Sequence, residues 1–230
     1  MITKQDIART MDHSILGTYC SKESIEQACR EAVEYGFASL YVTPSFVKRV
    51  KELVGDKCAV GVAIGFPWGT HTTATKIFES LEAIDNGATE LDIVINVSKL
   101  KAGDTDYVYN ELSEWVKACK GKNPNVICKA IIECFYLTHE EKIKAVDIVA
   151  RSGCDYVKQA TGMTPNSSYT YGDVLIMKKV AAGRCKIKAS GWLMNVEDCI
   201  ACLEAGCERV GNDHGPQWID KDYDNNRYYK

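Results

Sequence analysis

The chain lacks several features that would direct it to a particular class of protein. No hydrophobic run reaches the roughly 18–20 apolar residues of a membrane span, and residues 1–13 contain no apolar signal-peptide core. Basic and acidic residues are nearly balanced, 28 against 31, so no basic surface indicates nucleic acid binding. The four histidines, His13, His71, His139 and His214, show no metal-binding spacing. We therefore expect a cytoplasmic protein without bound metal, and neither a membrane nor a nucleic acid as its partner.

Cysteine is abundant, yet its pattern does not indicate disulfides. The count of 11 is odd, and most cysteines lie in apolar helix or strand patterns. This usage is typical of buried thiols in a reducing compartment. Cys199 and Cys202 form a Cys-x-x-Cys pair in the middle of a helical pattern, without a second pair, so core packing is a better interpretation than metal binding.

One pattern recurs four times: a helical stretch, a glycine, a short turn and an apolar strand. The glycines are Gly36, Gly87, Gly153 and Gly206, and glycine is the preferred residue just after a helix, where φ is often positive. A parallel strand must return through a crossover connection. Four copies of the unit therefore predict a parallel sheet.

The remaining pattern predicts strands and helices in alternation. We expect strands near 10–13, 38–43, 59–65, 91–96, 126–132, 155–160, 186–190 and 208–212. We expect helices near 22–35, 44–54, 71–86, 105–120, 139–151, 171–182 and 195–205. Eight strands over about 200 residues favour a closed (β/α)8 TIM barrel, an α/β fold that forms a single domain over residues 1–230.

Two features bear on this fold. An open doubly wound sheet is the alternative, although no G-x-G-x-x-G motif follows the first strand. Residues 213–230 are polar and show no amphipathic period. They predict an irregular C-terminal tail in place of the last covering helix.

Charged residues lie within or at the ends of three predicted strands. Asp92 lies in "ELDIVIN", Lys158 ends the strand in "DYVKQATG", and Lys188 lies in "KIKASG". The active site of such barrels lies at the carboxyl ends of the strands, so we expect these side chains around one mouth. Each residue alone would more often be a solvent-exposed one. Their occurrence on three strands of one barrel favours a site.

Two lysines on neighbouring strands would lower each other's affinity for protons. Strands lie about 4.8 Å apart, and both a like charge and burial lower the pKa of a lysine. A neutral lysine attacks a carbonyl carbon to form an imine, and a carboxylate such as Asp92 can then move the α-proton. The pattern predicts the chemistry of a Schiff-base aldolase.

The same residues lie in stretches that resemble deoxyribose-phosphate aldolases along nearly the whole chain. Among these stretches are "MDHSIL" (11–16), "AIGFPWGTHTTATKIFE" (63–79), "AIDNGATELDIVIN" (83–96), "GCDYVKQATG" (153–162) and "IKASG" (187–191). The resemblance implies a (β/α)8 barrel and a lyase of carbohydrate catabolism that needs no metal or cofactor. It also implies acetaldehyde as donor and glyceraldehyde 3-phosphate as acceptor.

The resemblance further implies roles for individual residues. Lys158 corresponds to the imine-forming lysine, Lys188 to the partner that lowers its pKa, and Asp92 to the proton-transfer carboxylate. The candidate substrate-binding residues are Asp12, Asn96, Lys129, Glu133, Thr161, Gly162, Ser190, Gly191, Trp192, Gly211, Asn212 and Asp213. For Lys129 and Glu133, a buried pair inside the barrel is the equal alternative.

The chain departs from the family where phosphate is expected to bind. Gly191-Trp192 stands in place of a Gly-Gly pair, and the last strand ends on Asn212-Asp213 without a serine. Trp192 and Asp213 would crowd and repel a phosphate dianion. We therefore expect an aldehyde or sugar substrate other than the usual phosphorylated acceptor. The alternatives are a conventional deoxyribose-phosphate aldolase and a non-catalytic binding or scaffold protein. Apolar residues on the helices near 44–54 and 71–86 are compatible with a homodimer.

Overall fold

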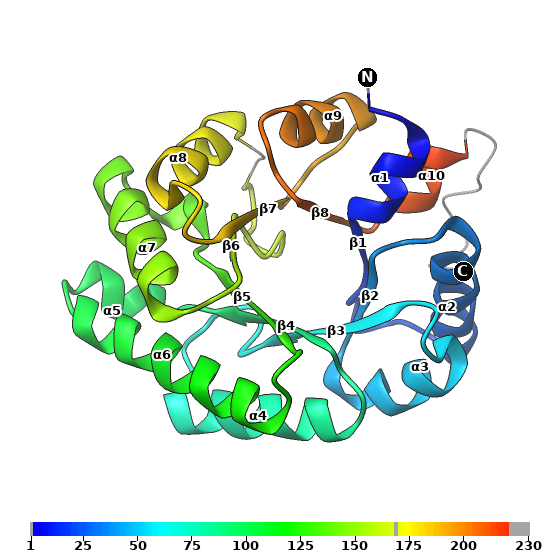
Figure 1. The fold of residues 1–230 in the computed structure, drawn as a ribbon, viewed down its shortest axis with the longest axis horizontal. Helices are drawn as coiled ribbons and strands as arrows, with labels where there is room; N and C mark the ends of the chain where they lie inside the picture. The colour runs from blue at the N-terminus through cyan, green and yellow to red at the C-terminus, as the bar shows by residue number, and fades with distance from the viewer. Residues whose placement is uncertain (1, 168–169, 221–230) are drawn as a thin grey trace.

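Eight parallel strands close into a barrel in the computed structural model, which describes residues 2–167 and 170–220. The strands pair in chain order, and β8 pairs with β1 (Figure 1). They are β1 (Met11–Ile15), β2 (Ser39–Val42), β3 (Ala59–Ile64), β4 (Glu90–Val94), β5 (Ile127–Ile131), β6 (Tyr156–Lys158), β7 (Lys186–Ser190) and β8 (Arg209–Asn212). The predicted (β/α)8 barrel is confirmed, and the open-sheet alternative is wrong because β1 and β8 are hydrogen-bonded.

Helices surround the barrel on its outer side (Figure 1). They are α1 (Lys4–Thr10), α2 (Lys22–Tyr35), α3 (Val47–Val54), α4 (Thr73–Asp85), α5 (Val97–Lys101), α6 (Thr105–Lys122), α7 (His139–Ser152), α8 (Tyr171–Ala181), α9 (Val196–Glu204) and α10 (Gly215–Ile219). The seven predicted helices are all present, within a few residues of their expected ends. None of the helices in the described part of the chain is long and apolar enough to cross a lipid bilayer.

The helix ends show why the sequence pattern was informative. Gly36 and Gly153 follow α2 and α7 with positive φ angles of 69° and 89°, a conformation that costs glycine little. At the other end of α7, Thr138 accepts a hydrogen bond from the backbone of Glu141, and Glu141 binds back to Thr138. This capping box stabilises the first turn of the helix.

Three short helices were not predicted. The helix α1 begins with a capping box between Thr3 and Asp6, and α5 follows β4 directly. The helix α10 corrects the prediction of an irregular tail, because Pro216 suits a first helical turn and Trp218 is buried where α10 packs on α1 and α2. The rest of the predicted tail, residues 221–230, lies outside the described residues.

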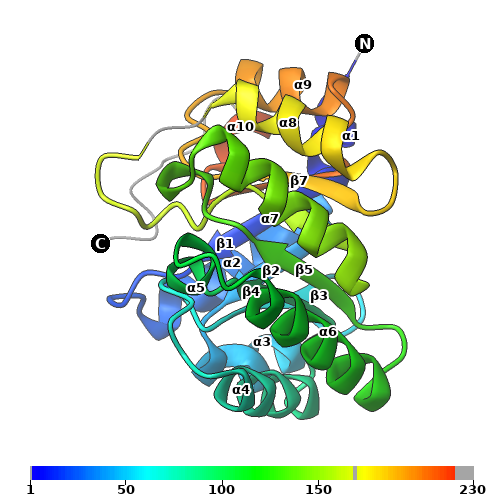
Figure 2. The ribbon, with the colours of Figure 1, turned by 90° about the vertical axis from the view of Figure 1, so that its left-hand side faces the viewer.

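The two faces of the barrel wall differ in polarity. Leu91 and Ile93 of β4 belong to the apolar core between the strands and the helices. Glu90 and Asp92, which alternate with them, are buried and bind charged side chains across the barrel interior. Successive residues of a strand point to opposite faces, so this alternation places ionisable groups inside the barrel. The loops after β1 and β6 project from the same end of it (Figure 2).

Candidate active site

Lys158, Lys188 and Asp92 meet inside the barrel. Lys158 and Lys188 are paired residues on the neighbouring strands β6 and β7. The amine of Lys158 donates a hydrogen bond to Oδ2 of Asp92 at 2.9 Å, and the amine of Lys188 donates to the same oxygen at 2.8 Å. The structure therefore brings together the three residues that the sequence placed on three different strands.

The environment of Lys188 lowers its pKa to about 8. Burial is the largest cause, because it disfavours the charged amine. The carboxylates of Asp12 and Asp92 oppose this shift, whereas the nearby amines of Lys158 and Lys129 add to it. Burial also disfavours charge on Asp92, but the same three lysines hold the pKa of this carboxyl well below its usual range. Asp92 is therefore a carboxylate at neutral pH.

Tyr41 of β2 is part of this cluster, although nothing in the sequence analysis selected it. Its hydroxyl donates to Oδ1 of Asp92 at 2.5 Å and accepts from the amine of Lys129 at 2.7 Å. The amine of Lys188 lies 4.1 Å from the centre of the Tyr41 ring. A Cβ atom on Gly61 of the neighbouring strand would lie 2.4 Å from this ring, so Gly61 provides the space that Tyr41 fills. Burial raises the pKa of Tyr41, which keeps its hydroxyl proton as a donor.

Lys129 lies deeper in the barrel than the lysine pair, within a second group of charges. Its amine contacts Oδ2 of Asp12 at 2.9 Å and also binds Glu90 and Tyr41. Arg209 of β8 donates to the other oxygen of Asp12 at 2.6 Å and to Glu90. Burial lowers the pKa of Lys129, but the surrounding carboxylates outweigh it and raise the pKa overall. The structure thus places this predicted substrate-binding residue inside the barrel, as a fixed cation.

A cavity of about 490 Å³ opens above the lysine pair. Eleven of the residues predicted for catalysis or substrate binding line it, and so does Tyr41. The eleven are Asp12, Lys158, Thr161, Gly162, Lys188, Ser190, Gly191, Trp192, Gly211, Asn212 and Asp213.

The polar side chains in the outer part of this cavity mostly hold loops in place. The hydroxyl of Ser190 donates to the carbonyl of Ala160 at 2.7 Å. The amide of Asn212 donates to the carbonyl of Leu193 at 2.6 Å. Trp192 has a positive φ of 54°, which is rare for a residue with a side chain. These bonds join the loops after β6 and β7 and the end of β8 into one wall.

Asp213 and His214 share a hydrogen bond at the end of β8, with Nδ1 and Oδ1 2.5 Å apart. Burial opposes the charge of Asp213, but the hydrogen bond with His214 lowers the pKa of Asp213 overall. The same bond raises the pKa of His214.

Among the described residues, Lys158 and Lys188 are the only lysines or arginines that line the cavity.

Three predicted substrate-binding residues lie outside this cavity. Besides Lys129, Asn96 caps α5 by accepting from the backbone of Lys99 at 3.1 Å. Glu133 accepts from the backbone N–H of Thr161 at 3.1 Å and does not bind Lys129. The predicted alternative of a Lys129–Glu133 pair is therefore wrong. The backbone at Glu133 has a positive φ of 51°, and its side chain points toward the loop after β6.

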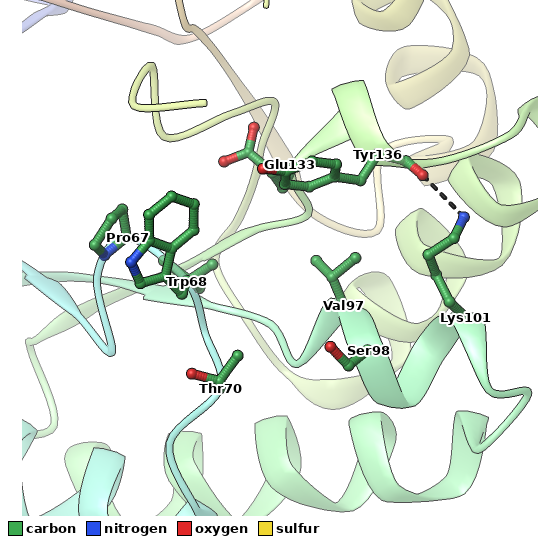
Figure 3. Close-up of a pocket in the computed structure, with 9 residues that line it drawn as sticks. Pro67, Trp68, Thr70, Val97, Ser98, Lys101, Glu133 and Tyr136 are labelled. Atoms are coloured by element: carbon green, nitrogen blue, oxygen red, sulfur yellow. Dashed lines mark hydrogen bonds between the residues drawn. The ribbon is translucent and has the colours of Figure 1, made fainter. Parts of the chain in front are cut away.

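A second cavity of about 400 Å³ lies at the same end of the barrel, between the segments that follow β3, β4 and β5. Figure 3 shows Trp68 and Pro67 on one side of it and Val97 and Tyr136 on another. Lys101 donates to the carbonyl of Tyr136 at 2.9 Å. Aromatic and apolar side chains make up most of its wall.

Comparison with known proteins agrees with this geometry. Residues 7–201 match the model of a family described as DeoC/LacD family aldolase. A deoxyribose-phosphate aldolase from Caldanaerobacter subterraneus subsp. tengcongensis is 42% identical over 217 residues, which cover 94% of this chain and 93% of that protein. One from Thermococcus gammatolerans is 42% identical over 218 residues, 94% of this chain and 96% of that protein.

Solved structures agree as well. One titled "QR15, an Aldolase" has a TM-score of 0.87 at 35% identity and covers 94% of this chain and 95% of its own. The deoxyribose phosphate aldolase from Aeropyrum pernix, whose title describes a tetramer, has a TM-score of 0.87 at 26% identity, over 95% of this chain and 92% of its own. The closed barrel, the shared motifs and these matches show that the chain belongs to the DeoC/LacD aldolase family.

Proposed function

We propose that this class I aldolase forms an imine between Lys158 and an acetaldehyde-type donor, and that it adds the resulting enamine to an acceptor aldehyde. One observation carries the proposal: the amines of Lys158 and Lys188 share one oxygen of Asp92 in the wall of a cavity. The side chain of Lys158 is 9% exposed and that of Lys188 is 1% exposed. Lys158 therefore has the better access to a substrate.

Lys188 is suited to accept the proton that Lys158 must lose before it attacks. Its pKa of about 8 leaves part of the enzyme with a neutral Lys188 near neutral pH. The oxygen of Asp92 that both amines contact offers a short path for this proton. An amine that gives up its proton in this way becomes a nucleophile.

The reaction then follows from the chemistry of imines. The neutral nitrogen of Lys158 attacks the carbonyl carbon of the donor, and the carbonyl oxygen leaves as water after it takes up two protons. Loss of a proton from the neighbouring carbon gives an enamine, whose electron pair forms the new bond to the carbonyl carbon of the acceptor. The acceptor oxygen takes a proton, and water then releases a 3-hydroxyaldehyde from Lys158. Asp92, fixed by Tyr41 and the two lysines, moves the α-proton directly or through water.

We infer that the acceptor is not the usual phosphorylated aldehyde. In the described part of the chain, no lysine or arginine beyond the reacting pair lines the cavity. Asp213 places a carboxylate there, and Trp192 occupies part of its outer wall. A phosphate dianion would lose water without gaining a cation, which is unfavourable in a desolvated site.

A conventional deoxyribose-phosphate aldolase is the second candidate. It is favoured by the names of relatives that are 42% identical to this chain. A non-catalytic binding or scaffold protein would keep the lysines without turnover. The following experiment separates the three.

The protein is incubated with acetaldehyde, reduced with borohydride and examined by peptide mass spectrometry. We expect one ethyl group on Lys158 and none in the Lys158→Ala variant, which should also lose all turnover. An unmodified Lys158 in the wild-type protein would support the non-catalytic reading. Rates of cleavage of 2-deoxyribose and of its 5-phosphate then decide between the two aldolases. A clear preference for the phosphate would overturn the altered acceptor, and Trp192→Gly should increase acceptance of the phosphate.

We further infer a homodimer in the cytoplasm. Phe78 of α4 and Leu53 of α3 are exposed apolar side chains on two of the outer helices, and large exposed apolar groups often mark an interface. None of the eleven cysteines forms a disulfide in the described residues, which suits a reducing compartment. Light scattering of the purified protein tests the dimer, and a monomer at micromolar concentration would contradict it.

A further inference from the structure

The outer end of the 490 Å³ cavity is unusually apolar. Twelve large hydrophobic side chains of the described residues are exposed, and four of them line this one cavity. These four, which we call the apolar rim, are Tyr19, Met163, Trp192 and Met194, and they are 47% to 68% exposed. Single exposed hydrophobic residues are normal on a protein surface, but their concentration at a binding site indicates a ligand with apolar surface.

The rim comes from three separate loops at the carboxyl end of the barrel. Tyr19 follows β1, Met163 follows β6, and Trp192 and Met194 follow β7. The yellow loop after β6 and the blue loop after β1 project on the same side in Figure 2. The rim is thus a product of the fold and not of a single apolar stretch of sequence.

The local backbone turns two of these side chains outward. Gly191 and Trp192 have successive positive φ angles of 89° and 54°. Leu193 is fully buried between the exposed Trp192 and Met194, and its carbonyl accepts the amide of Asn212 at 2.6 Å. Because Leu193 is held in place, the side chains of Trp192 and Met194 on either side of it lie at the mouth of the cavity.

The charged side chains that line the cavity favour a ligand whose part near the apolar rim is uncharged. The amines of Lys158 and Lys188 are both bound to Asp92. Asp213 and His214 bind each other at 2.5 Å. In the described ranges no other ionised side chain lines the cavity except Asp12, which holds Lys188 at 2.5 Å. Each charge is already compensated, so the outer end offers apolar surface and no free cation.

We propose that the acceptor aldehyde of this enzyme carries an apolar or aromatic body, which packs against the apolar rim while its carbonyl carbon reaches the enamine on Lys158. The proposal rests on the imine chemistry proposed above and names the acceptor class for that site. Tyrosine and tryptophan contribute large contact areas, and methionine adapts to irregular shapes. A cavity of about 490 Å³ is within the range that small-molecule ligands occupy.

The test is a series of acceptors with acetaldehyde as donor: glyceraldehyde 3-phosphate, glyceraldehyde, butanal, hexanal and 3-phenylpropanal. Initial rates are measured as consumption of the acceptor. Each buried methylene contributes about 0.8 kcal/mol, or about fourfold in kcat/KM. We therefore expect kcat/KM to rise by about tenfold or more from butanal to hexanal, and both hexanal and 3-phenylpropanal to exceed glyceraldehyde 3-phosphate.

Variants locate the effect at the rim. Met194→Ala should lower the ratio of kcat/KM for hexanal over butanal by about threefold to tenfold, since it removes apolar contact area. Leu175→Ala is the control, because Leu175 is also an exposed apolar residue, lies on α8 and does not line the cavity. In this variant the ratio of kcat/KM for hexanal over butanal should stay at the wild-type value. The acceptor series uses only the wild-type protein and stands even if a variant fails to fold.

Failure of this proposal and failure of the proposed function give different results. A borohydride adduct on Lys158 together with equal kcat/KM for butanal and hexanal would overturn the acceptor class and leave the imine chemistry intact. A preference for glyceraldehyde 3-phosphate over every apolar aldehyde would overturn it as well. Absence of the adduct would overturn both.

Discussion

Two lysines in the barrel interior are equally buried, yet their pKa values move in opposite directions. Lys129 and Lys188 have side chains that are 0% and 1% exposed, and both contact Asp12. Lys129 also binds Glu90 and has Asp92 at 3.7 Å, so attraction to carboxylates outweighs burial and its pKa rises. Around Lys188 the other amines add to the effect of burial, and its pKa falls to about 8.

Lysine therefore has two different roles at two neighbouring positions in the barrel interior. In the deeper layer, carboxylates surround Lys129 and make it a permanent cation that supports the fold. Toward the mouth, Lys158 and Lys188 share one oxygen of Asp92, and burial together with the neighbouring amines lowers the pKa of Lys188. The balance of carboxylates and amines around each lysine therefore determines whether its pKa is raised or lowered.

The largest expected effect comes from removing the lysine with the lowered pKa. Lys188→Met should reduce kcat by about 10²–10⁴-fold, because the proton of Lys158 loses its acceptor. The pH profile of kcat/KM should also lose its rise near pH 8. Lys186→Met, an exposed lysine of the same strand, is the control. A variant that keeps the wild-type rate and profile would show that Lys188 plays no part in proton transfer.

Removing the other lysine should affect stability more than chemistry. Lys129→Met leaves Asp12 and Glu90 with less compensating charge, and loss of one partner from a buried ion pair costs about 3–5 kcal/mol. Urea unfolding measures the change against Lys48→Met, an exposed lysine of α3. In the same variant Asp12 would interact more strongly with Lys188, so we expect the midpoint near pH 8 to move upward. Unchanged stability would contradict the role of Lys129 as a fixed cation.

A smaller effect is expected at Tyr41, which connects the two layers. Tyr41→Phe keeps the ring but removes hydrogen bonds to Asp92 and Lys129, and a bond to a charged group contributes about 1.5–3 kcal/mol. We expect a loss of stability in this range and a shift of the pH–rate midpoint. Tyr109→Phe on the outer helix α6 provides the control. If the two variants had the same unfolding free energy and pH profile, Tyr41 would only fill space.

The remaining effect is a dependence of stability on pH. The pKa of Lys188 is about 8 in the folded protein and about 10.4 in an unfolded chain. Between these values the unfolded chain binds more protons, so this group makes the free energy of unfolding increase as pH rises. We expect wild-type protein to gain stability relative to Lys188→Met between about pH 8 and pH 10. Parallel curves for the two proteins would show that the pKa of Lys188 is not lowered. Lys129, whose pKa is raised, should add no such increase in this range.

Several features could be predicted because they depend on local patterns. Helix α2 was predicted with its observed ends; Gly36 marked the carboxyl end in the sequence, and the structure shows Ser21 as the cap at the other end. The three charged residues Asp92, Lys158 and Lys188 were selected because they interrupt apolar strands, the two lysines near the carboxyl ends.

Other features depend on contacts that no local pattern contains. Tyr41 lies in an apolar strand, where an aromatic residue normally indicates core packing, and its role depends on Gly61 one strand away. Lys129 and Glu133 are four residues apart, yet the backbone turns Glu133 toward Thr161. The helix α10 forms because Trp218 finds a buried position against α1 and α2.

The sequence alone indicated the repeated helix–strand unit, the closed barrel and the three charged residues Asp92, Lys158 and Lys188 that meet inside it. These depend on periodicity and on the residues at strand ends, which neighbours along the chain determine. The tertiary structure alone decided which lysine has the lowered pKa, how Tyr41 joins the two charged layers and where the apolar rim lies. Each of these depends on side chains from strands or loops far apart in the chain, because burial and charge–charge interactions act through space.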